Sequence, residues 1–258
     1  MKFSFGVITR GVFEDGADER VDRIIDSIEA LNVPEYEIIV VGTSKVKRDR
    51  TTVVPFNEEI KPQWITRKKN IITELAKYEN VTYSHDYKIY MSDWYEGFLK
   101  FGDDFKVCVT KVLTHDDKRW RDWIIWPWNS KLPADLQPPN AAKMDELLRY
   151  TDPNDLPPSL IPYDISHLSK YQYVNGSFWV AKKRFMQEYP LDNVRVWGQD
   201  EDTEWSFRVR QKHDFKMNPY STNKIIKPRF VGPNGHSDSY KVSPPHIVEQ
   251  ILKYFPAP

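Results

Sequence analysis

The chain of 258 residues carries 37 basic and 37 acidic side chains. This balance gives no reason to expect nucleic acid or an anionic membrane as the main partner. At this length the chain can bury one large core, so we expect a single domain over residues 1–258.

Two further features bear on where the protein works. No apolar run approaches the ~20 residues that cross a bilayer. The single cysteine, Cys108, lies in an apolar run, where a buried and unreactive thiol is expected. One cysteine excludes a disulfide within the chain, which favours a reducing compartment. The sequence therefore predicts a soluble, cytoplasmic protein without a transmembrane segment.

The first 113 residues alternate strand-like and helix-like segments. Residues 3–9 and 37–41 are typical of buried strands, and residues 21–31 carry apolar side chains at helical spacing. A strand–helix–strand unit of this kind implies a parallel sheet. The pattern continues with a strand over 51–54, a helix over 65–78, a strand over 81–84, a helix over 94–101 and a strand over 105–113. The apolar side of the 65–78 helix would consist of Ile71, Ile72 and Leu75.

Residues 114–171 differ from the rest, because they are rich in Trp and Pro and show weak periodicity. An unstructured loop of this length is unusual in a compact domain. We therefore expect an elaborated insertion packed over one edge of the sheet. Regular structure resumes with a strand over 173–181, a helix over 182–189, a helix over 200–212 and a last helix opened by Ser243.

An acidic side chain directly follows the strand over 81–84, in His85-Asp86-Tyr87. In open α/β sheets, ligands bind beyond the carboxyl ends of the strands. A carboxylate there can hold Mg2+ or Mn2+ together with phosphate oxygens and water. An Asp after a strand is also a common turn or cap residue, so the motif alone leaves both interpretations open.

A second acidic motif places four carboxylates in residues 200–204. Acidic residues at a helix start are favoured by about 0.3–1 kcal/mol each, so a solvated cap would also explain them. Asp202, however, lies three residues before Trp205, which places it on the side of the helix that faces the core. A partly buried carboxylate in this position can act as a general base toward a hydroxyl group.

Taken together, several segments resemble GT-A glycosyltransferases of the broad inverting type related to family 2. The matching segments are residues 3–10, 37–42, 65–71, 83–87, 173–181 and 197–206. The resemblance covers roughly residues 1–113 and 171–230. It implies a Rossmann-like α/β fold of the GT-A type, with a mostly parallel sheet flanked by helices. It further implies a nucleotide-sugar half over 1–113 and an acceptor half over 114–258, which carries the aromatic and Pro-rich insertion 114–171.

The resemblance also implies which residues bind the donor. The nucleotide-sugar would contact Thr9, Arg10, Arg67, Lys68, Asn70, His85, Gly176 and Ser177. Asp86 matches the metal ligand of an Asp-X-Asp motif and would hold Mn2+ or Mg2+. Ser84 occupies the first acidic position of that motif, which leaves the ribose contact open. His236 would complete the metal site, although a surface role is an alternative for a histidine in a Gly-rich loop.

Glu201 and Asp202 match the Glu-Asp pair in which the Asp is generally the base. By resemblance, Asp202 would take a proton from the acceptor, Glu201 would hold hydroxyl groups, and Trp197 and Asn175 would contact the acceptor. The implied activity is metal-dependent transfer of a hexosyl or pentosyl group from a nucleotide-sugar, with UDP as the expected nucleotide. The acceptor would be a hydroxyl group of an oligosaccharide or glycoconjugate, and the anomeric configuration would invert.

Three alternatives stay open at this point. A retaining transferase fits the same motifs, since sequence alone does not place a carboxylate relative to the sugar. A nucleotidyltransferase would need a Gly-rich basic loop after the first strand, and Thr9-Arg-Gly-Val-Phe matches this poorly. A non-catalytic carbohydrate-binding protein would bind glycans without hydrolysing a nucleotide-sugar.

Overall fold

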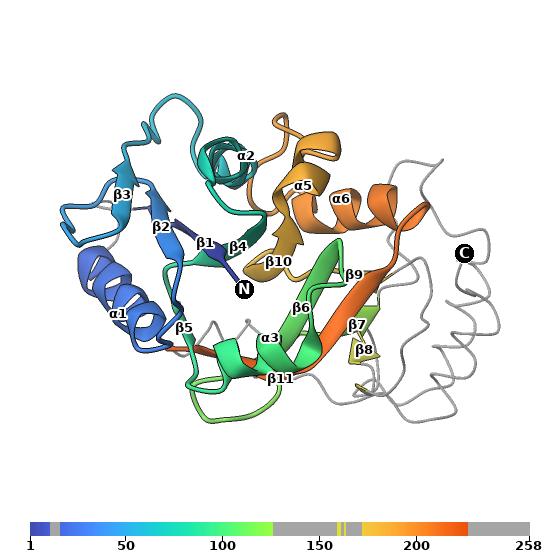
Figure 1. Cartoon of the computed structure of the whole chain (residues 1–258). Coiled ribbons are helices and arrows are strands. Elements are labelled where there is room, and N and C mark those ends of the chain that lie inside the picture. The colour runs from blue at the N-terminus through green and yellow to red at the C-terminus, as the bar shows by residue number, and fades with distance from the viewer. Residues whose placement is uncertain (11–15, 126–158, 161–162, 164–171, 227–258) are drawn as a thin grey trace.

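The computed structural model of the chain describes residues 1–10, 16–125, 159–160, 163 and 172–226 (Figure 1). An eight-stranded sheet forms the centre of this part, in the order β3-β2-β1-β4-β10-β6-β11-β5. The strands of this sheet are β1 (Phe3–Ile8), β2 (Tyr36–Val41), β3 (Thr51–Val54), β4 (Asn80–His85), β5 (Lys88–Tyr90), β6 (Val107–Leu113), β10 (Phe178–Lys182) and β11 (Phe215–Ile225). A smaller antiparallel sheet consists of β7 (Ile124–Ile125), β8 (Ser159–Leu160) and β9 (Gln172–Tyr173).

Strands β1 to β4 pair in parallel, as the strand–helix–strand pattern predicts. Strand β10 runs antiparallel to both β4 and β6, and β6 pairs in parallel with β11. Although β5 follows β4 almost directly in sequence, it pairs with β11 at the far edge of the sheet. The sheet is therefore curled, and the predicted α/β fold with a large sheet flanked by helices is confirmed.

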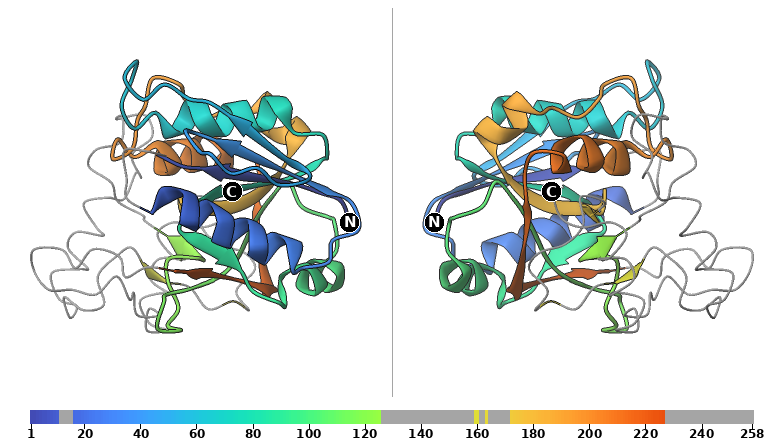
Figure 2. Two further views of the ribbon diagram at one scale, coloured as in Figure 1. Left: turned by 90° about the vertical axis from the view of Figure 1, so that its left-hand side faces the viewer. Right: turned by 90° about the vertical axis from the view of Figure 1, so that its right-hand side faces the viewer.

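Helices cover both faces of the sheet (Figure 2). The helices are α1 (Ala17–Glu29), α2 (Ile65–Leu75), α3 (Trp94–Phe101), α5 (Lys183–Glu188) and α6 (Glu201–Arg210). Helices α2, α5 and α6 pack on one core, which includes Ile72, Trp179 and Trp205. Helices α1 and α3 pack on the opposite core, which includes Phe3 and Phe5. Two buried apolar cores on either side of one sheet are what the hydrophobic effect requires of a layered α/β domain.

Helix α2 lies close to the sheet because β1 carries a glycine beneath it. A Cβ atom at Gly6 would lie 2.4 Å from Ile72 Cγ2 and 2.6 Å from the carbonyl oxygen of Thr82. Such a separation is far below van der Waals contact, so a side chain at Gly6 would lift the helix or distort the strand. The close approach brings the polar side chains of α2 within reach of the strand ends.

Some predicted elements differ from the observed ones. Helix α2 ends at Leu75 instead of residue 78, and Leu75, predicted to be buried, is 51% exposed. Residues 173–181 form no single strand, because a turn over 174–177 separates β9 from β10. Within the turn, Asn175 Oδ1 accepts hydrogen bonds from the Ser177 amide at 2.9 Å and its hydroxyl at 2.6 Å. Local side-chain bonds of this kind compete with a strand ladder.

The predicted burial of the single cysteine is confirmed, unlike that of Leu75. Cys108 is fully buried, and burial raises the pKa of its thiol. Trp120 and Trp123, from the start of the expected insertion, are core residues that are 0% and 2% exposed. No helix in the described part of the chain is both long enough and apolar enough to cross a membrane. The insertion beyond residue 125, apart from residues 159–160 and 163, and the helix predicted after Ser243 lie outside the described residues.

Candidate active site at the carboxyl edge of the sheet

The two predicted donor-binding strands end side by side. Strands β1 and β4 are parallel and in register, with Ile8 opposite His85, so Thr9 and Asp86 follow them at the same edge. The amide of Asp86 donates a hydrogen bond of 3.1 Å to the carbonyl oxygen of Ile8. Strand β10 begins at Phe178 opposite Ser84, which brings the turn over 174–177 to this edge as well.

Asp86 is held by two side chains at this edge. Its Oδ2 atom accepts a hydrogen bond of 2.8 Å from the Thr9 hydroxyl group and one of 3.2 Å from Arg20 Nη2 on α1. Asp86 is 5% exposed, and an ion pair with a guanidinium group compensates a buried carboxylate. Arg20 was not expected from the sequence. It adds a cationic side chain beside the predicted metal ligand.

Lys68 holds the backbone of Thr9 in place. Its ammonium group donates a hydrogen bond of 2.7 Å to the carbonyl oxygen of Thr9 and another to the carboxylate of Glu58. Burial lowers the pKa of Lys68, while the hydrogen bond and charge of Glu58 act in the opposite direction. Lys68 therefore fixes the backbone at the end of β1, and the next residue, Arg10, is exposed.

A short series of contacts connects Asp86 to the second acidic motif. The amide of His85 donates a hydrogen bond of 3.1 Å to the carbonyl oxygen of Ser177. The residue before Ser177, Gly176, donates its amide hydrogen to Asp202 Oδ2 at 2.7 Å. The two motifs are more than one hundred residues apart in sequence, but the turn over 174–177 bridges them directly.

The acidic pair lies at the start of α6. Asp202 Oδ1 also accepts a hydrogen bond of 2.9 Å from the Thr203 amide, so both carboxylate oxygens are oriented by backbone donors. Glu201 is 6% exposed, and burial raises its pKa from 4.5 to about 7. The negative charge of Asp202 raises this pKa further, and the positive charge of Lys69 lowers it. Glu201 therefore changes its charge near neutral pH.

Lys69 is a site residue that the sequence patterns did not identify. Its ammonium group is fully buried, donates a hydrogen bond of 2.6 Å to the carbonyl oxygen of Gly176, and lies 4.4 Å from the centre of the Trp179 ring. Burial lowers its pKa to about 8, against the opposing charges of Glu201 and Asp202. Its spacing in the sequence indicates which side of the helix it occupies. Lys69 stands four residues after Ile65 and three before Ile72, on the buried face of the helix.

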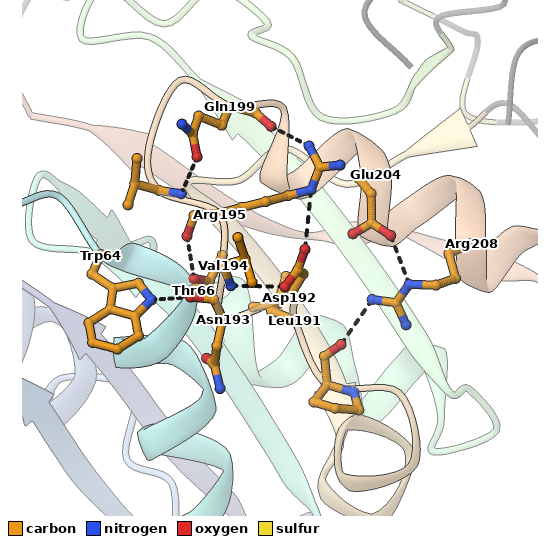
Figure 3. A network of polar contacts seen from close by, with 12 residues as sticks. Trp64, Thr66, Leu191, Asp192, Asn193, Val194, Arg195, Gln199, Glu204 and Arg208 are labelled. Atoms are coloured by element: carbon orange, nitrogen blue, oxygen red, sulfur yellow. Dashed lines mark hydrogen bonds and ion pairs between the residues drawn. The ribbon is translucent and has the colours of Figure 1, made fainter. Parts of the chain in front are cut away.

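The loop over 191–200, which leads into α6, is fastened to the start of α2 (Figure 3). Trp64 Nε1 donates a hydrogen bond of 2.7 Å to the carbonyl oxygen of Asn193, and the Thr66 hydroxyl donates one of 2.7 Å to that of Arg195. The amide of Trp197 donates one of 3.0 Å to the carbonyl oxygen of Gln63. These contacts fix the loop that precedes Glu201 and Asp202.

Several predicted binding residues make contacts of a different kind. Asn70 donates hydrogen bonds to Leu191 O at 2.9 Å and to Asn193 Oδ1 at 2.8 Å, and its Oδ1 accepts one from the Leu191 amide at 3.1 Å. Arg67 pairs with Glu74 along the outer side of α2. The amide group of Asn175 donates to the carbonyl oxygen of Arg121 at 3.1 Å. Asn70 and Asn175 therefore join separate segments of the chain, whereas Arg67 pairs within its own helix.

Trp197 and His85 keep surfaces that a ligand can reach. The Trp197 side chain is 53% exposed, which is unusual for a ring of this size. His85 is partly exposed, and its ring centre lies 5.3 Å from that of Tyr87. The roles predicted for both residues stay predictions. His236 lies outside the described residues, so its predicted part in a metal site is not tested.

The described residues contain no group of three or more His, Cys, Asp or Glu side chains that could hold a metal ion. The predicted metal ligand, Asp86, is a carboxylate whose Oδ2 atom lies 3.2 Å from Arg20 Nη2. Mg2+ and Mn2+ accept oxygen ligands and often keep several waters, with substrate phosphates completing the coordination. A single carboxylate such as that of Asp86 is chemically suited to a cation that binds together with a diphosphate.

Comparison with known proteins shows the fold. No protein-family model matches the sequence, and no curated protein matches it. The fold is similar to that of GalNAc-T7 crystallised with UDP, GalNAc and Mn2+, with a TM-score of 0.58 at 14% identity over 93% of this chain and 46% of that one. A structure of S. aureus TarS gives a TM-score of 0.50 at 11% identity over 88% of this chain and 37% of that one. The chain spans less than half the length of either structure, and it has the GT-A type of fold.

Proposed function

We propose that the protein is a metal-dependent glycosyltransferase that moves a sugar from a nucleotide-sugar, most simply a UDP-sugar, to a hydroxyl group of an oligosaccharide or glycoconjugate. One observation supports this proposal above the others. The turn over 174–177 connects Asp86, through the His85–Ser177 hydrogen bond, to Asp202, through the Gly176–Asp202 hydrogen bond. This reaction needs one carboxylate near the diphosphate of the donor and a second near the acceptor hydroxyl, and both would lie at one edge of the sheet. The similar structure of GalNAc-T7 contains UDP and Mn2+, which supports UDP as the nucleotide and Mn2+ as the metal in this proposal.

The donor would bind along the ends of β1 and β4. Thr9, held by Lys68 and Asp86, would contact the nucleotide, and the exposed Arg10 would reach its phosphates. Arg20 would add a second cationic group on the diphosphate side. Charge-assisted hydrogen bonds from arginine to phosphate are short, strong and often bidentate. His85, Gly176 and Ser177 would then face the sugar.

Asp86 would be the protein ligand of Mn2+ or Mg2+. When bound, the cation would stabilise negative charge on the departing diphosphate. Arg20 lies 3.2 Å from the same carboxylate, so it would contribute positive charge at that position as well. His236 remains the candidate for a further ligand.

On the acceptor side, Asp202 would be the general base. Two backbone amides orient its carboxylate, and a carboxylate has about four sites that accept hydrogen bonds, so capacity remains for an acceptor hydroxyl. Asp202 would take the proton of that hydroxyl as its oxygen attacks the anomeric carbon on the face opposite the diphosphate, and the configuration would invert. Glu201 would hold hydroxyl groups, and the exposed Trp197 ring would offer a flat apolar surface to a sugar.

A panel of nucleotide-sugars with Mn2+ tests the proposal through slow donor hydrolysis and thermal stabilisation. We expect one UDP-sugar to be hydrolysed, with the rate falling by about 10²–10⁴ in Asp202→Asn, the range contributed by a general base. Asp104→Asn, the same change at a fully exposed site, should keep the wild-type rate. No hydrolysis of any donor, or full hydrolysis in Asp202→Asn, would contradict the proposal. NMR of the product anomer then distinguishes inversion from retention.

A further inference from the structure

Lys69 occupies a position that the chemistry above does not use. It is a fully buried cation on α2 that contacts the turn carrying Gly176, while the acidic pair lies on the other side of that turn. A buried ammonium group is costly unless it is paired and hydrogen-bonded. The Gly176 carbonyl oxygen and the Trp179 ring contact this ammonium group directly, and the negative charges of Glu201 and Asp202 act on it from a longer distance.

The backbone of Gly176 is held from two directions, through the two peptide groups on either side of its Cα atom. Its carbonyl oxygen accepts a hydrogen bond of 2.6 Å from Lys69 Nζ, and its amide donates one of 2.7 Å to Asp202 Oδ2. A Cβ atom at Gly176 would lie 2.8 Å from Asp202 Oδ2 and 3.1 Å from Glu201 Oε1, so this backbone lies directly against both carboxylates. Lys69 therefore acts on the pair both through this backbone and through its charge.

The charges that act on the pair come from a small set of side chains. Glu201 is influenced by Asp202, Lys69 and Asp200, of which only Lys69 is cationic. The turn over 174–177, Val-Asn-Gly-Ser, contributes no acidic or basic side chain. In the preceding loop, Arg195 is directed to Asp192, at 3.6 Å, and to the carbonyl oxygen of Gln199, at 2.7 Å. Among the described residues, Lys69 is thus the cation whose positive charge acts on Glu201.

We propose that Lys69 is a positioning residue of the active site: its buried ammonium group fixes the Gly176 backbone, whose amide holds Asp202, and favours the doubly charged form of the Glu201–Asp202 pair. Its catalytic consequence rests on the proposed function, whereas its electrostatic effect on Glu201 does not. Two adjacent carboxylates in a buried site repel each other, so one of them would otherwise take up a proton. A pair that already holds one proton is a weaker base toward the acceptor hydroxyl than the doubly charged pair.

A carboxyl titration tests the electrostatic effect without any enzyme assay. Side-chain 13C NMR in the metal-free protein follows Glu201, whose signal is assigned by its loss in Glu201→Gln. Lys69→Gln keeps a donor for the Gly176 carbonyl but removes the charge, so we expect the pKa of Glu201 to rise by about one unit or more. Lys69→Arg keeps the charge and should restore the wild-type value to within about half a unit. An unchanged Glu201 titration in Lys69→Gln would overturn the proposal.

The pH profile of donor hydrolysis provides the second readout. The acidic limb should move to higher pH in Lys69→Gln by the same shift that NMR measures, because the charged pair is then reached only at higher pH. A purely structural role would lower the rate equally at every pH. Lys183→Gln is the matched control, since Lys183 Nζ also donates to a backbone carbonyl, that of Ala76 at 2.6 Å, beyond the carboxyl end of α2. It should shift neither readout.

Failure of this proposal is distinguishable from failure of the proposed function. If wild-type protein hydrolyses no donor but the pKa of Glu201 still rises in Lys69→Gln, the glycosyltransferase proposal fails and the proposed electrostatic effect of Lys69 stands. If Lys69→Gln does not fold, the reciprocal measurement decides. The pKa of Lys69, followed through its side-chain signals, should fall in Glu201→Gln because the ammonium group loses a negative neighbour. An equal value in both proteins would overturn the proposal.

Discussion

Gly176 lies where a side chain would meet both members of the acidic pair. With a Cβ atom 2.8 Å from Asp202 Oδ2, Gly176→Ala has to displace that carboxylate or the turn. A misplacement of about 1 Å in an active site can cost on the order of 100-fold in rate. We therefore expect donor hydrolysis to fall about 100-fold, while the unfolding midpoint changes little because the carboxylate end can move. Steady-state rates and thermal unfolding of the variant measure the two effects.

The control for this substitution is Gly102→Ala. Gly102 has a φ of 91°, and a Cβ atom there would have no neighbour within 4 Å, so the substitution strains the backbone without touching the acidic pair. It should lower the unfolding midpoint and leave the hydrolysis rate of the folded protein intact. Wild-type hydrolysis in Gly176→Ala would show that the contact with Asp202 has no role in the reaction.

Glu201 gives the protein a pH-dependent stability whose sign follows from its pKa. In the folded state this pKa is raised to about 7, above the 4.5 of an ordinary glutamate, so between these values the folded state binds more protons than the unfolded state. The free energy of unfolding therefore falls as pH rises from about 4.5 to 7. Glu201→Gln removes this dependence. We therefore expect the difference in free energy of unfolding, variant minus wild type, to be about 1–3 kcal/mol more positive at pH 7.5 than at pH 4.5.

Urea unfolding of Glu201→Gln and wild type at the two pH values measures this difference. Glu96→Gln, at an exposed position on α3, should change the free energy of unfolding by the same small amount at both pH values. The lowered pKa of Lys69 acts in a separate window: between about 8 and 10.5 the unfolded state binds more protons, so stability rises with pH there. A Glu201→Gln effect that is independent of pH would contradict the assignment of the raised pKa.

At the scale of elements, α2 shows where sequence patterns succeed and fail. Apolar periodicity located the helix and its sheet-facing Ile72, because burial of apolar side chains at a period of 3.6 dominates helix placement. The same criterion placed Leu75 inside, whereas the structure exposes it. The spacing of Lys69 from Ile65 and Ile72 indicates the buried face, but a lysine is rarely buried unless it is paired. The burial of Lys69 depends on partners distant in sequence, namely the Gly176 carbonyl and the acidic pair, which no local pattern contains.

Helix α2 also fastens the loop over 191–200, and this contact can be broken separately. Asn70 makes three hydrogen bonds to Leu191 and Asn193. Asn70→Ala leaves the amide and carbonyl groups of the buried Leu191 without these hydrogen bonds, at a cost of about 1–3 kcal/mol each. We expect a lower unfolding free energy, faster limited proteolysis within the loop, and slower donor hydrolysis because the loop leads directly into Glu201 and Asp202. Proteolysis with mass mapping and urea unfolding measure these effects.

Gln211→Ala is the control for Asn70→Ala. It removes an amide at the exposed end of α6, where Gln211 donates only to the carbonyl oxygen of Phe207 within its own helix among the contacts described. Stability and loop cleavage should stay at wild-type values. If Asn70→Ala cleaves no faster than Gln211→Ala, the other contacts of the loop, from Lys61, Gln63, Trp64 and Thr66, hold it without Asn70.

At the scale of the molecule, the path of the sheet explains what the sequence did not reveal. The first half was predictable, since strands β1 to β4 are local strand–helix–strand units. Strand β11 was not predicted, because buried polar residues such as Asn218 and Asn223 interrupt its apolar pattern and its register shifts between Asn218 and Thr222. The position of β5 at the far edge was not predictable either, since it depends on pairing with β11. Motif resemblance, by contrast, assigned Asp86 and Asp202 to one site in advance of any geometry.

The whole-molecule arrangement makes a prediction about metal binding. If Asp86 holds the cation as proposed, it does so as a carboxylate already paired with Arg20, so phosphate oxygens of the nucleotide would complete the coordination. Mn2+ should therefore tighten UDP binding by about tenfold or more, and UDP should tighten Mn2+ binding by the same factor, because coupling between two sites is reciprocal. Titration calorimetry of each ligand with and without the other measures both factors, and chelation of the metal should reverse the gain.

Asp86→Asn should reduce that coupling to near unity while leaving weak UDP binding, since Thr9 and the arginines remain. Asp104→Asn, far out on the surface, should keep the full coupling. Tight Mn2+ binding without nucleotide would instead require a complete set of protein ligands, including groups beyond the described residues. Such a result would contradict a cation held mainly by the diphosphate, and the positive charge of Arg20 beside Asp86 would then have to be displaced by the metal.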